Sequence, residues 1–139
     1  MGMDVYGRDP SNKLKDDGER FVGEYFRNNM WWWNPLWEYC VSLYGDKMPP
    51  MEMRSNLDDD DDYYVVLEAD DGFMNNGYGL DRNESEELGT ILFLEIQYGN
   101  TAKLFDEIKE EFPNSHHFSV ENVQEFSDFL MNCGGFNIY

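Results

Sequence analysis

Carboxylates are the side chains whose spacing in this sequence could do chemistry. Glu121, Glu125 and Asp128 recur at i, i+4 and i+7, which places them within about 60° of one another on a helix and spreads them over about 10 Å. Two further acidic clusters consist of Glu107, Glu110 and Glu111, and of the run Asp58, Asp59, Asp60, Asp61 and Asp62. Such rows of charge can imitate nucleic-acid phosphates and attract a basic protein surface. We predict all three clusters as partner-binding residues, the alternative being ordinary solvated faces.

The sequence predicts neither a metal site nor a catalytic site. The aspartate run lacks the alternating ligands and the glycine turn of a calcium loop. His116 and His117 are adjacent, and no Cys or His lies at the spacing of a zinc site. Nucleophile-elbow, phosphate-loop and dinucleotide-binding motifs are missing from the sequence. We therefore expect a protein that is not an enzyme and has no catalytic residue, metal or cofactor.

The aromatic block over residues 25–37 is a second candidate site. Its four tryptophans fall within seven residues, and three consecutive tryptophans cannot all face one core, so at least one must lie at an edge, a pocket or an interface. The polar donors beside them suit a planar or anionic ligand. The candidate residues are Arg27, Asn28, Asn29, Trp31, Trp32, Trp33 and Trp37. The alternative is a packed core with an ion pair between Arg27 and a carboxylate.

Composition excludes several classes of protein. The chain has 139 residues with 10 Lys+Arg and 29 Asp+Glu, for a net charge of −19. This charge excludes direct binding to nucleic acid or to an anionic membrane, because phosphate groups would repel it. An aromatic content of 17% excludes a disordered acidic tail. The length fits a single domain over residues 1–139.

The charge is concentrated in one part of the chain. Residues 1–54 carry seven bases and nine acids, whereas residues 55–139 carry three bases and twenty acids. The acidic part also has the clearest helical periodicity, so the asymmetry indicates an interaction face rather than a tail. Solubility is the alternative explanation.

The ends and the cysteines favour a cytoplasmic protein. No apolar stretch is long enough to span a membrane, and the first residues lack the basic and apolar regions of a signal peptide. Cys40 and Cys133 have no nearby cysteine partner, which favours free thiols and a reducing compartment. One disulfide between these two residues is the alternative.

Four helices are expected to position the candidate groups. Apolar periodicity predicts helices over 35–44, from 81 or 83 to about 99, over 101–112 and over 119–134. We expect Asn34 to cap the first, Asp81 with Glu84 to form a capping box on the second, and Ser119 to cap the fourth. The fourth helix should bury Val123, Phe126, Leu130 and Cys133, with Phe118 and Val123 as a hydrophobic staple and Gly134 at its end.

The remaining segments complete the predicted fold. Residues 1–33 are expected to be irregular and aromatic-rich because glycines and a proline punctuate them. The acidic run 58–62 should form a loop, and residues 63–68 have the composition of a strand, although a helix is not excluded. The predicted fold class is mostly α (α+β), with about four helices in one domain, a helical body over 34–139 and a small β element near 63–68.

Three sequence blocks resemble a group of small uncharacterised proteins from bacteriophages and prophages. The blocks are DVYGR (4–8) followed by GEYFRNNMWWWNPLW (23–37), the segment 88–99 with LG at its start and YG at its end, and FSVENVQEF (118–126) with CGGF (133–136). No activity is assigned to this group, so the resemblance implies no catalytic or binding residue. It implies a phage-encoded accessory protein that acts inside an infected or lysogenic bacterium, on a host or defence protein.

These observations lead to one main hypothesis and two alternatives. The main hypothesis is a non-enzymatic, acidic, phage-type protein that inhibits a basic host or defence protein, such as one that binds nucleic acid, by charge mimicry. The first alternative is a small-ligand or nucleotide-binding domain that uses Arg27 and the tryptophans. The second is a self-assembling phage accessory protein, a homo-oligomer with surface tryptophans at its interface.

Overall fold

The computed structural model describes residues 2–15, 18–54, 64–114 and 116–139. Within these residues the helices are α1 (Met30–Tyr44), α2 (Arg82–Gln97), α3 (Asn100–Glu111) and α4 (Val120–Asn132), with short 3-10 helices η1 (Gly45–Lys47) and η2 (Ala69–Phe73). The strands are β1 (Gly2–Gly7), β2 (Tyr25–Asn29), β3 (Met51–Arg54), β4 (Tyr64–Leu67) and β5 (Phe136–Ile138). The predicted mostly helical α+β fold class is confirmed.

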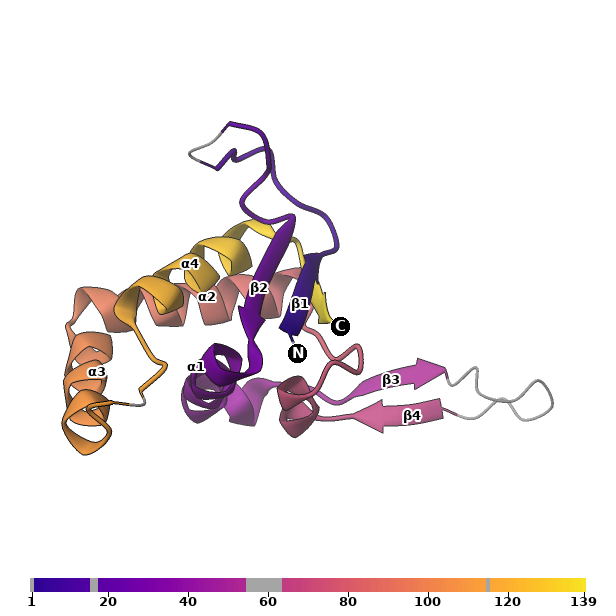
Figure 1. The fold of residues 1–139 in the computed structure, drawn as a ribbon. Coiled ribbons are helices and arrows are strands. Elements are labelled where there is room, and N and C mark those ends of the chain that lie inside the picture. The colour runs from indigo at the N-terminus through magenta and orange to yellow at the C-terminus, as the bar shows by residue number, and fades with distance from the viewer. Residues whose placement is uncertain (1, 16–17, 55–63, 115) are drawn as a thin grey trace.

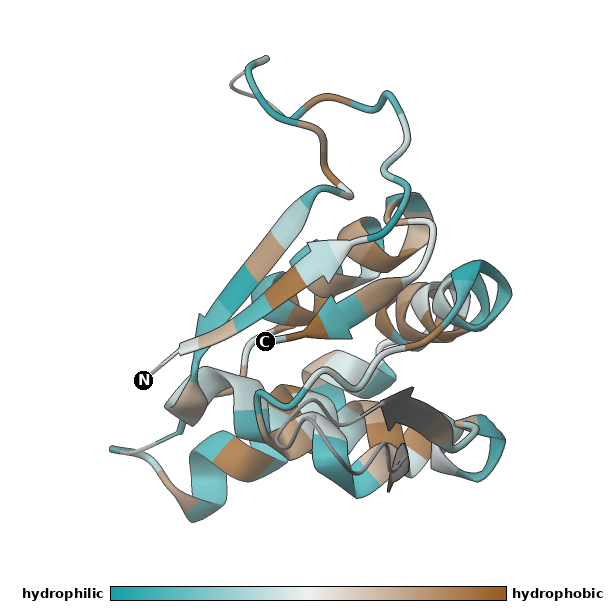
Figure 2. Ribbon diagram, turned by 90° about the vertical axis from the view of Figure 1, so that its right-hand side faces the viewer, coloured by the Kyte–Doolittle hydropathy of each residue, from teal (hydrophilic) through white to brown (hydrophobic). Residues whose placement is uncertain are grey.

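A three-stranded antiparallel sheet in the order β2-β1-β5 joins segments from opposite ends of the sequence (Figure 1). β1 pairs with β2 from Gly2 opposite Asn29 to Tyr6 opposite Tyr25, and three of its residues pair with β5. Hydrophilic and hydrophobic residues alternate along these strands (Figure 2), because successive side chains point to opposite faces. One face packs on the helices through buried side chains, which are Met3, Val5, Phe26, Phe136 and Ile138.

This sheet corrects the prediction that residues 1–33 are irregular. Glycines and Pro10 do punctuate the connection between β1 and β2, but the flanking segments are strands. β1 has only two buried apolar residues, Met3 and Val5, which is too short an alternation to indicate a strand by itself. Its pairing partner β5 lies far away in sequence, so no local pattern marks the sheet.

α1 begins earlier than the sequence predicts. Its first residue is Met30 and its N-cap is Asn29, whose side chain accepts a hydrogen bond from the Trp32 backbone N–H at 3.1 Å. The prediction that Asn34 caps the helix is therefore wrong, and Pro35 lies inside the helix. An internal proline costs one backbone hydrogen bond. The burial of the tryptophans on this helix offsets that cost.

The local signals of α2 and α4 predict these helices correctly. Asp81 and Glu84 form the expected capping box, and Ser119 accepts a hydrogen bond from the Asn122 N–H at 3.1 Å. Gly134, with φ of 66°, follows the end of α4 in the left-handed conformation that terminates many helices. The predicted inward residues of α4 are all buried, as is the staple residue Phe118.

Trp33 and Trp37 form the centre of the core. Neither side chain is exposed to solvent, and their rings stack with centroids 5.5 Å apart. The Trp33 indole N–H donates to the Gly72 carbonyl at 2.7 Å, and the Trp37 indole N–H donates to the Ala69 carbonyl at 2.9 Å. η2 is therefore held against α1 by both indoles.

A two-stranded hairpin of β3 and β4 extends away from the helices (Figure 1). Its register runs from Met51 opposite Leu67 to Arg54 opposite Tyr64. The strand predicted near 63–68 is thus confirmed over 64–67. β3 was not predicted, because Pro49 and Pro50 directly before it indicate a break in regular structure. No helix within the described residues is long and apolar enough to cross a membrane.

Candidate functional site

An open groove of about 600 Å³ lies between α1, α3 and the segment that follows α3. α1 contributes one set of lining residues, namely Trp31, Asn34, Pro35, Glu38, Tyr39 and Ser42. α3 and the following segment contribute the other set, namely Leu104, Ile108, Phe112, His116, His117 and Phe118. The groove is therefore built by residues that are well separated in the sequence.

Helical periodicity explains why these side chains face the groove. On α1 the lining positions fall at i, i+3, i+4, i+7, i+8 and i+11, which is one face of a helix over about 16 Å. On the other wall, Leu104, Ile108 and Phe112 recur at i, i+4 and i+8, over about 12 Å. Because most of these groups are apolar, the groove offers an apolar surface to solvent.

The groove has one carboxylate and no fixed positive charge among its lining residues. Glu38 is exposed and lies in the middle of the α1 stripe. None of the lining residues, all of which belong to the described part of the chain, is Lys or Arg. The electrostatic environment of the groove therefore favours a neutral or cationic occupant.

Trp31 is the most accessible large side chain of the groove. Its side chain is 70% exposed, and its ring centroid lies 6.2 Å from that of His117. Trp32 is half-buried and meets the same imidazole edge-on, at 5.6 Å. The expectation that at least one of the three consecutive tryptophans lies at an edge or a pocket is confirmed by Trp31.

The buried polar group of the groove, the Tyr39 hydroxyl, already has a partner. Tyr39 is buried, and its hydroxyl hydrogen-bonds to Thr101 Oγ1 at 2.9 Å. Burial raises the pKa of Tyr39 above its ordinary value, because the phenolate would lose its hydration. Phe118 packs edge-on against Tyr39 at 5.5 Å. The floor is thus a packed, neutral surface.

Arg27, Asn28 and Asn29 do not line this groove. Arg27 Nε lies 3.2 Å from Asp4 Oδ1 on the neighbouring strand, and Asn29 is the N-cap of α1. Asn28 exchanges two amide hydrogen bonds with Asn122, at 3.0 and 2.9 Å. The structure thus places these residues in structural contacts, as the alternative of a core with an Arg27–carboxylate ion pair describes.

The acidic residues of α4 have a basic neighbourhood that the sequence did not indicate. Glu125 and Asp128 line a second cavity, of about 480 Å³, together with Lys13 and Lys15 from the connection between β1 and β2. Asp128 is half-buried and accepts a hydrogen bond from the Gln124 amide at 3.1 Å. Only Glu121 and Glu125 of this row are exposed. The lysines partly offset the charge that α4 presents.

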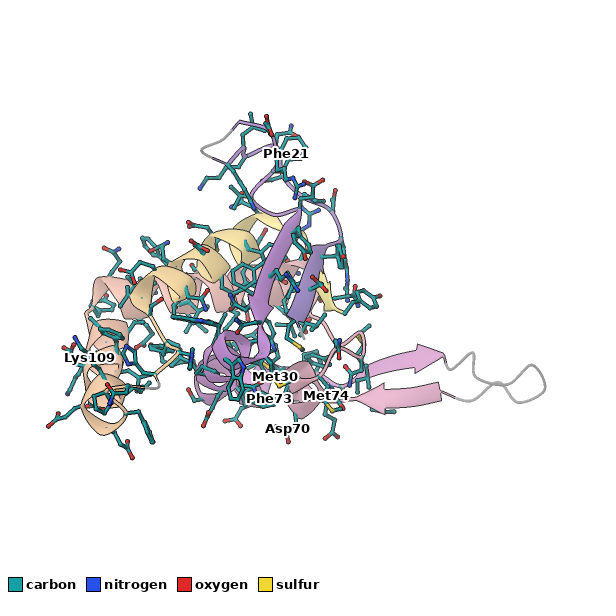
Figure 3. The ribbon with its side chains drawn as sticks, viewed as in Figure 1. Phe21, Met30, Asp70, Phe73, Met74 and Lys109 are labelled. Atoms are coloured by element: carbon teal, nitrogen blue, oxygen red, sulfur yellow. The ribbon has the colours of Figure 1, made fainter. Side chains whose placement is uncertain are left out.

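The carboxylates of α3 lie outside the groove lining. By helical spacing Glu107 and Glu111 flank the groove-facing stripe, whereas Asp106 and Glu110 face away from the groove. Glu107, Glu110 and Glu111 are all exposed, as is Asp106. The Lys109 ammonium lies 5.9 Å from the Phe105 ring centroid and extends from the outer part of α3 (Figure 3). The aspartate run Asp58–Asp62, the third predicted cluster, lies outside the described residues.

The groove residues missed by sequence reasoning include Glu38, Leu104 and Ile108. A signal for the α1 wall was present, since positions 31, 34, 35, 38, 39 and 42 form one helical stripe once the helix is taken to begin at Met30. The expected start at Pro35 hid this stripe. The α3 wall could not be recognised, because its spacing is also that of an ordinary core-facing stripe.

Other reactive groups are dispersed. Cys40 and Cys133 are free and buried, and burial raises the pKa of both thiols. Within the described ranges, no group of three or more His, Cys, Asp or Glu side chains is placed to hold a metal ion.

Comparison with known proteins gives no match, whether to a family model, to a curated protein or to a solved structure. The function must therefore be inferred from the residues of this chain.

Proposed function

We propose that this protein is a non-enzymatic binding protein whose acidic helical part engages a basic protein. The observation that carries the proposal is the arrangement of α3. One side of α3 forms a wall of the open apolar groove. The rest of its surface exposes four carboxylates against two lysines, Lys103 and Lys109, and the carboxylates are Asp106, Glu107, Glu110 and Glu111. An apolar centre bordered by charged residues is the usual anatomy of a protein-binding surface.

The charge of the chain supports a protein partner rather than a nucleic acid. A net charge of −19 would repel phosphate groups but would accelerate the approach of a basic protein surface. Acid-rich helices could occupy the surface on which such a protein holds nucleic acid. If the chain shares the origin of the phage and prophage proteins that it resembles, the partner is a host or defence protein, and occupancy of that surface would inhibit it.

α3 is a stronger candidate than α4 for the main contact. Lysines accompany both sets of carboxylates, since Lys103 and Lys109 belong to α3 itself and Lys13 and Lys15 line the cavity of Glu125 and Asp128. The carboxylates of α3 are, however, all exposed beside the apolar groove, whereas Asp128 is half-buried. Glu121, at the exposed start of α4, does not line the cavity of Lys13 and Lys15. We therefore propose it as a second contact with the partner, beside α3. We therefore rank the predicted partner-binding residues with the carboxylates of α3 first and Glu121 next.

A capture experiment tests this proposal. The tagged protein is immobilised, incubated with bacterial lysate at ~50 mM and ~500 mM salt, and its retained partners are identified by mass spectrometry. We expect one basic protein at low salt and its release at high salt, because screening weakens the attraction. The triple variant Glu107→Lys, Glu110→Lys, Glu111→Lys should lose this partner.

A matched variant separates a local effect from the effect of net charge. Asp46→Lys, Asp70→Lys and Glu86→Lys change the charge of the chain by the same amount at exposed positions, and Asp70 lies far from α3 (Figure 3). This control should retain the partner. Equal loss in both triple variants would contradict a contact at α3, and a partner that resists high salt would contradict the electrostatic mechanism.

A second candidate function, small-ligand binding, is favoured by the volume of the groove. About 600 Å³ lies within the usual range for ligand pockets. The ligand would be apolar, because Arg27 does not reach the groove and most lining groups are apolar. Thermal unfolding in the presence of a library of apolar compounds tests this function, because a true ligand raises the melting temperature. The same ligand should not raise the melting temperature of the Ile108→Asn variant.

A further inference from the structure

We infer that the groove between α1 and α3 receives an amphipathic, cationic helix of the basic partner, an inference that rests on the proposed function. The apolar side of that helix would contact the groove, and its Lys or Arg side chains would reach the carboxylates at the groove's border. The inference thus adds a specific anchoring site to the acidic surface.

The dimensions and chemistry of the groove walls favour a helix over an extended peptide. The α1 stripe is about 16 Å long, equal to three helical turns, and a helical partner would bring anchors at i, i+3, i+4 and i+7. An extended peptide needs backbone hydrogen-bond partners, such as a sheet edge provides. Here both long walls are helices, whose backbone groups bond within the helix, so the occupant must satisfy its own backbone.

Charge complementarity identifies the occupant as cationic. Glu38 lies within the α1 stripe, and helical spacing places Glu107 and Glu111 along one flank of the α3 stripe formed by residues 104, 108 and 112. Lys109 lies on the opposite flank, against the Phe105 ring, and Lys103, one turn before Glu107, offsets only part of the acidic flank. A helix with basic residues beside its apolar face would therefore pair with Glu38 on the α1 wall and with Glu107 and Glu111 on the flank of the α3 wall.

Two other occupants fit the groove less well. A polar small molecule needs convergent buried polar groups to fix its orientation, but Tyr39, the one buried polar side chain among the lining residues, is already bonded to Thr101. Among the described residues, the one buried side-chain polar atom without a hydrogen-bond partner, Ser85 Oγ, belongs to α2 and does not line the groove. A second copy of this chain would bring another net charge of −19 to the same surface.

Trp31 provides both the anchor and the signal for a test. It is 70% exposed, whereas Trp33 and Trp37 are fully buried. An occupant that covers the groove would bury the Trp31 indole, and exposed tryptophans with apolar surroundings are frequent binding hot spots. Trp31 should therefore dominate any change of tryptophan fluorescence on binding.

The test uses two synthetic peptides of identical composition, made only of Leu and Lys. One places Leu at i, i+3, i+4 and i+7, and the other alternates Leu and Lys so that a helix would have no apolar face. Binding to the full chain is measured by tryptophan fluorescence and by calorimetry at ~50 mM salt. We expect the helical peptide to shift Trp emission to shorter wavelength and to bind about tenfold more tightly than the alternating isomer.

Variants of the groove and of a distant surface complete the experiment. Trp31→Ala should weaken binding of the helical peptide about tenfold, and Glu38→Gln should weaken it by a smaller factor. The controls Tyr98→Ala, at a side chain that is 77% exposed, and Glu86→Gln should leave the affinity unchanged. Thermal unfolding of each variant verifies that it is folded.

Three outcomes would overturn the inference. Equal affinity for both peptides with no effect of Trp31→Ala would show that only charge is recognised, which leaves the proposed function intact. No binding of either peptide would exclude a cationic helix, while the capture experiment with the α3 variants decides the proposed function separately. A dimeric mass in solution that Trp31→Ala converts to a monomeric mass would identify a second copy as the occupant.

Discussion

Trp31 and Trp33 lie two residues apart on α1 but have opposite environments. The Trp33 side chain is fully buried, stacks on Trp37 and donates its indole N–H to the Gly72 carbonyl. Trp31 is 70% exposed and borders the groove beside His117. The difference arises because two residues correspond to a rotation of about 200° around a helix. One tryptophan therefore stabilises the fold, and the other is available for binding.

The largest contrast is expected from truncating each tryptophan. Trp33→Ala removes a buried ring and leaves the Gly72 carbonyl without its donor, so we expect a loss of about 3–5 kcal/mol in the free energy of unfolding. Trp31→Ala should change that free energy by less than about 0.5 kcal/mol. Urea denaturation of both variants measures the two values, and comparable losses would refute this division of roles.

The next effect concerns the support of the buried tryptophans. A Cβ atom at Gly72 would lie 2.2 Å from Trp37 Cε2, so Gly72→Ala should force a shift of η2 and cost about 1–3 kcal/mol. Gly45→Ala is a milder comparison, because its Cβ would approach one methyl group of Val41, at 2.9 Å, rather than a buried ring at 2.2 Å. The melting temperature should fall more in the first variant than in the second. If the two variants behave alike, the indole–η2 contact is not rigid.

The smallest effect at neutral pH concerns Tyr78, whose buried hydroxyl also makes the free energy of unfolding depend on pH. Tyr78 packs edge-on against Trp37, and burial raises its pKa from 10.0 to about 12. Because the folded pKa exceeds the unfolded value, this contribution is complete below pH 10 and is lost as the pH rises through about 12. Tyr78→Phe should cost about 1 kcal/mol at neutral pH through its hydrogen bond to the Pro49 carbonyl.

Unfolding measured at several pH values across the alkaline range checks this expectation. The wild-type free energy of unfolding should fall above pH 10, and Tyr78→Phe should make that fall shallower. A fall of unchanged steepness would show that Tyr78 does not contribute to it. Peptide binding at the groove gives the comparison. Tyr78 packs on Trp37, and neither residue lines the groove, so Tyr78→Phe should leave the affinity unchanged.

Features set by neighbouring residues could be predicted from the sequence. Ser119, Asp81 and Gly134 mark helix ends by bonding to, or bending, the adjacent backbone. The apolar stripe of α4, which runs from Val123 to the C-cap residue Cys133, is buried as expected. These signals act over a few residues, so a single sequence contains them.

Features set by distant residues could not be predicted. β1 pairs with β5 from the other end of the chain, and neither segment has enough alternating apolar residues to indicate a strand alone. Lys13 and Lys15 reach the cavity of Glu125 and Asp128 through the fold. Pro35 indicated a helix start at residue 35, whereas the helix begins at Met30 and buries Trp33 in the core. The candidate site has the same origin, since its walls belong to separate helices.

The order of the sheet has a consequence for how fast the molecule reaches its native state. β1 is the central strand, and its pairing with β5 joins Val5 to Ile138 across most of the sequence. Closing so long a loop costs entropy before any contact repays it, and non-local pairing slows folding. We therefore expect the helices to associate early and the central strand to be enclosed in the last, rate-limiting step.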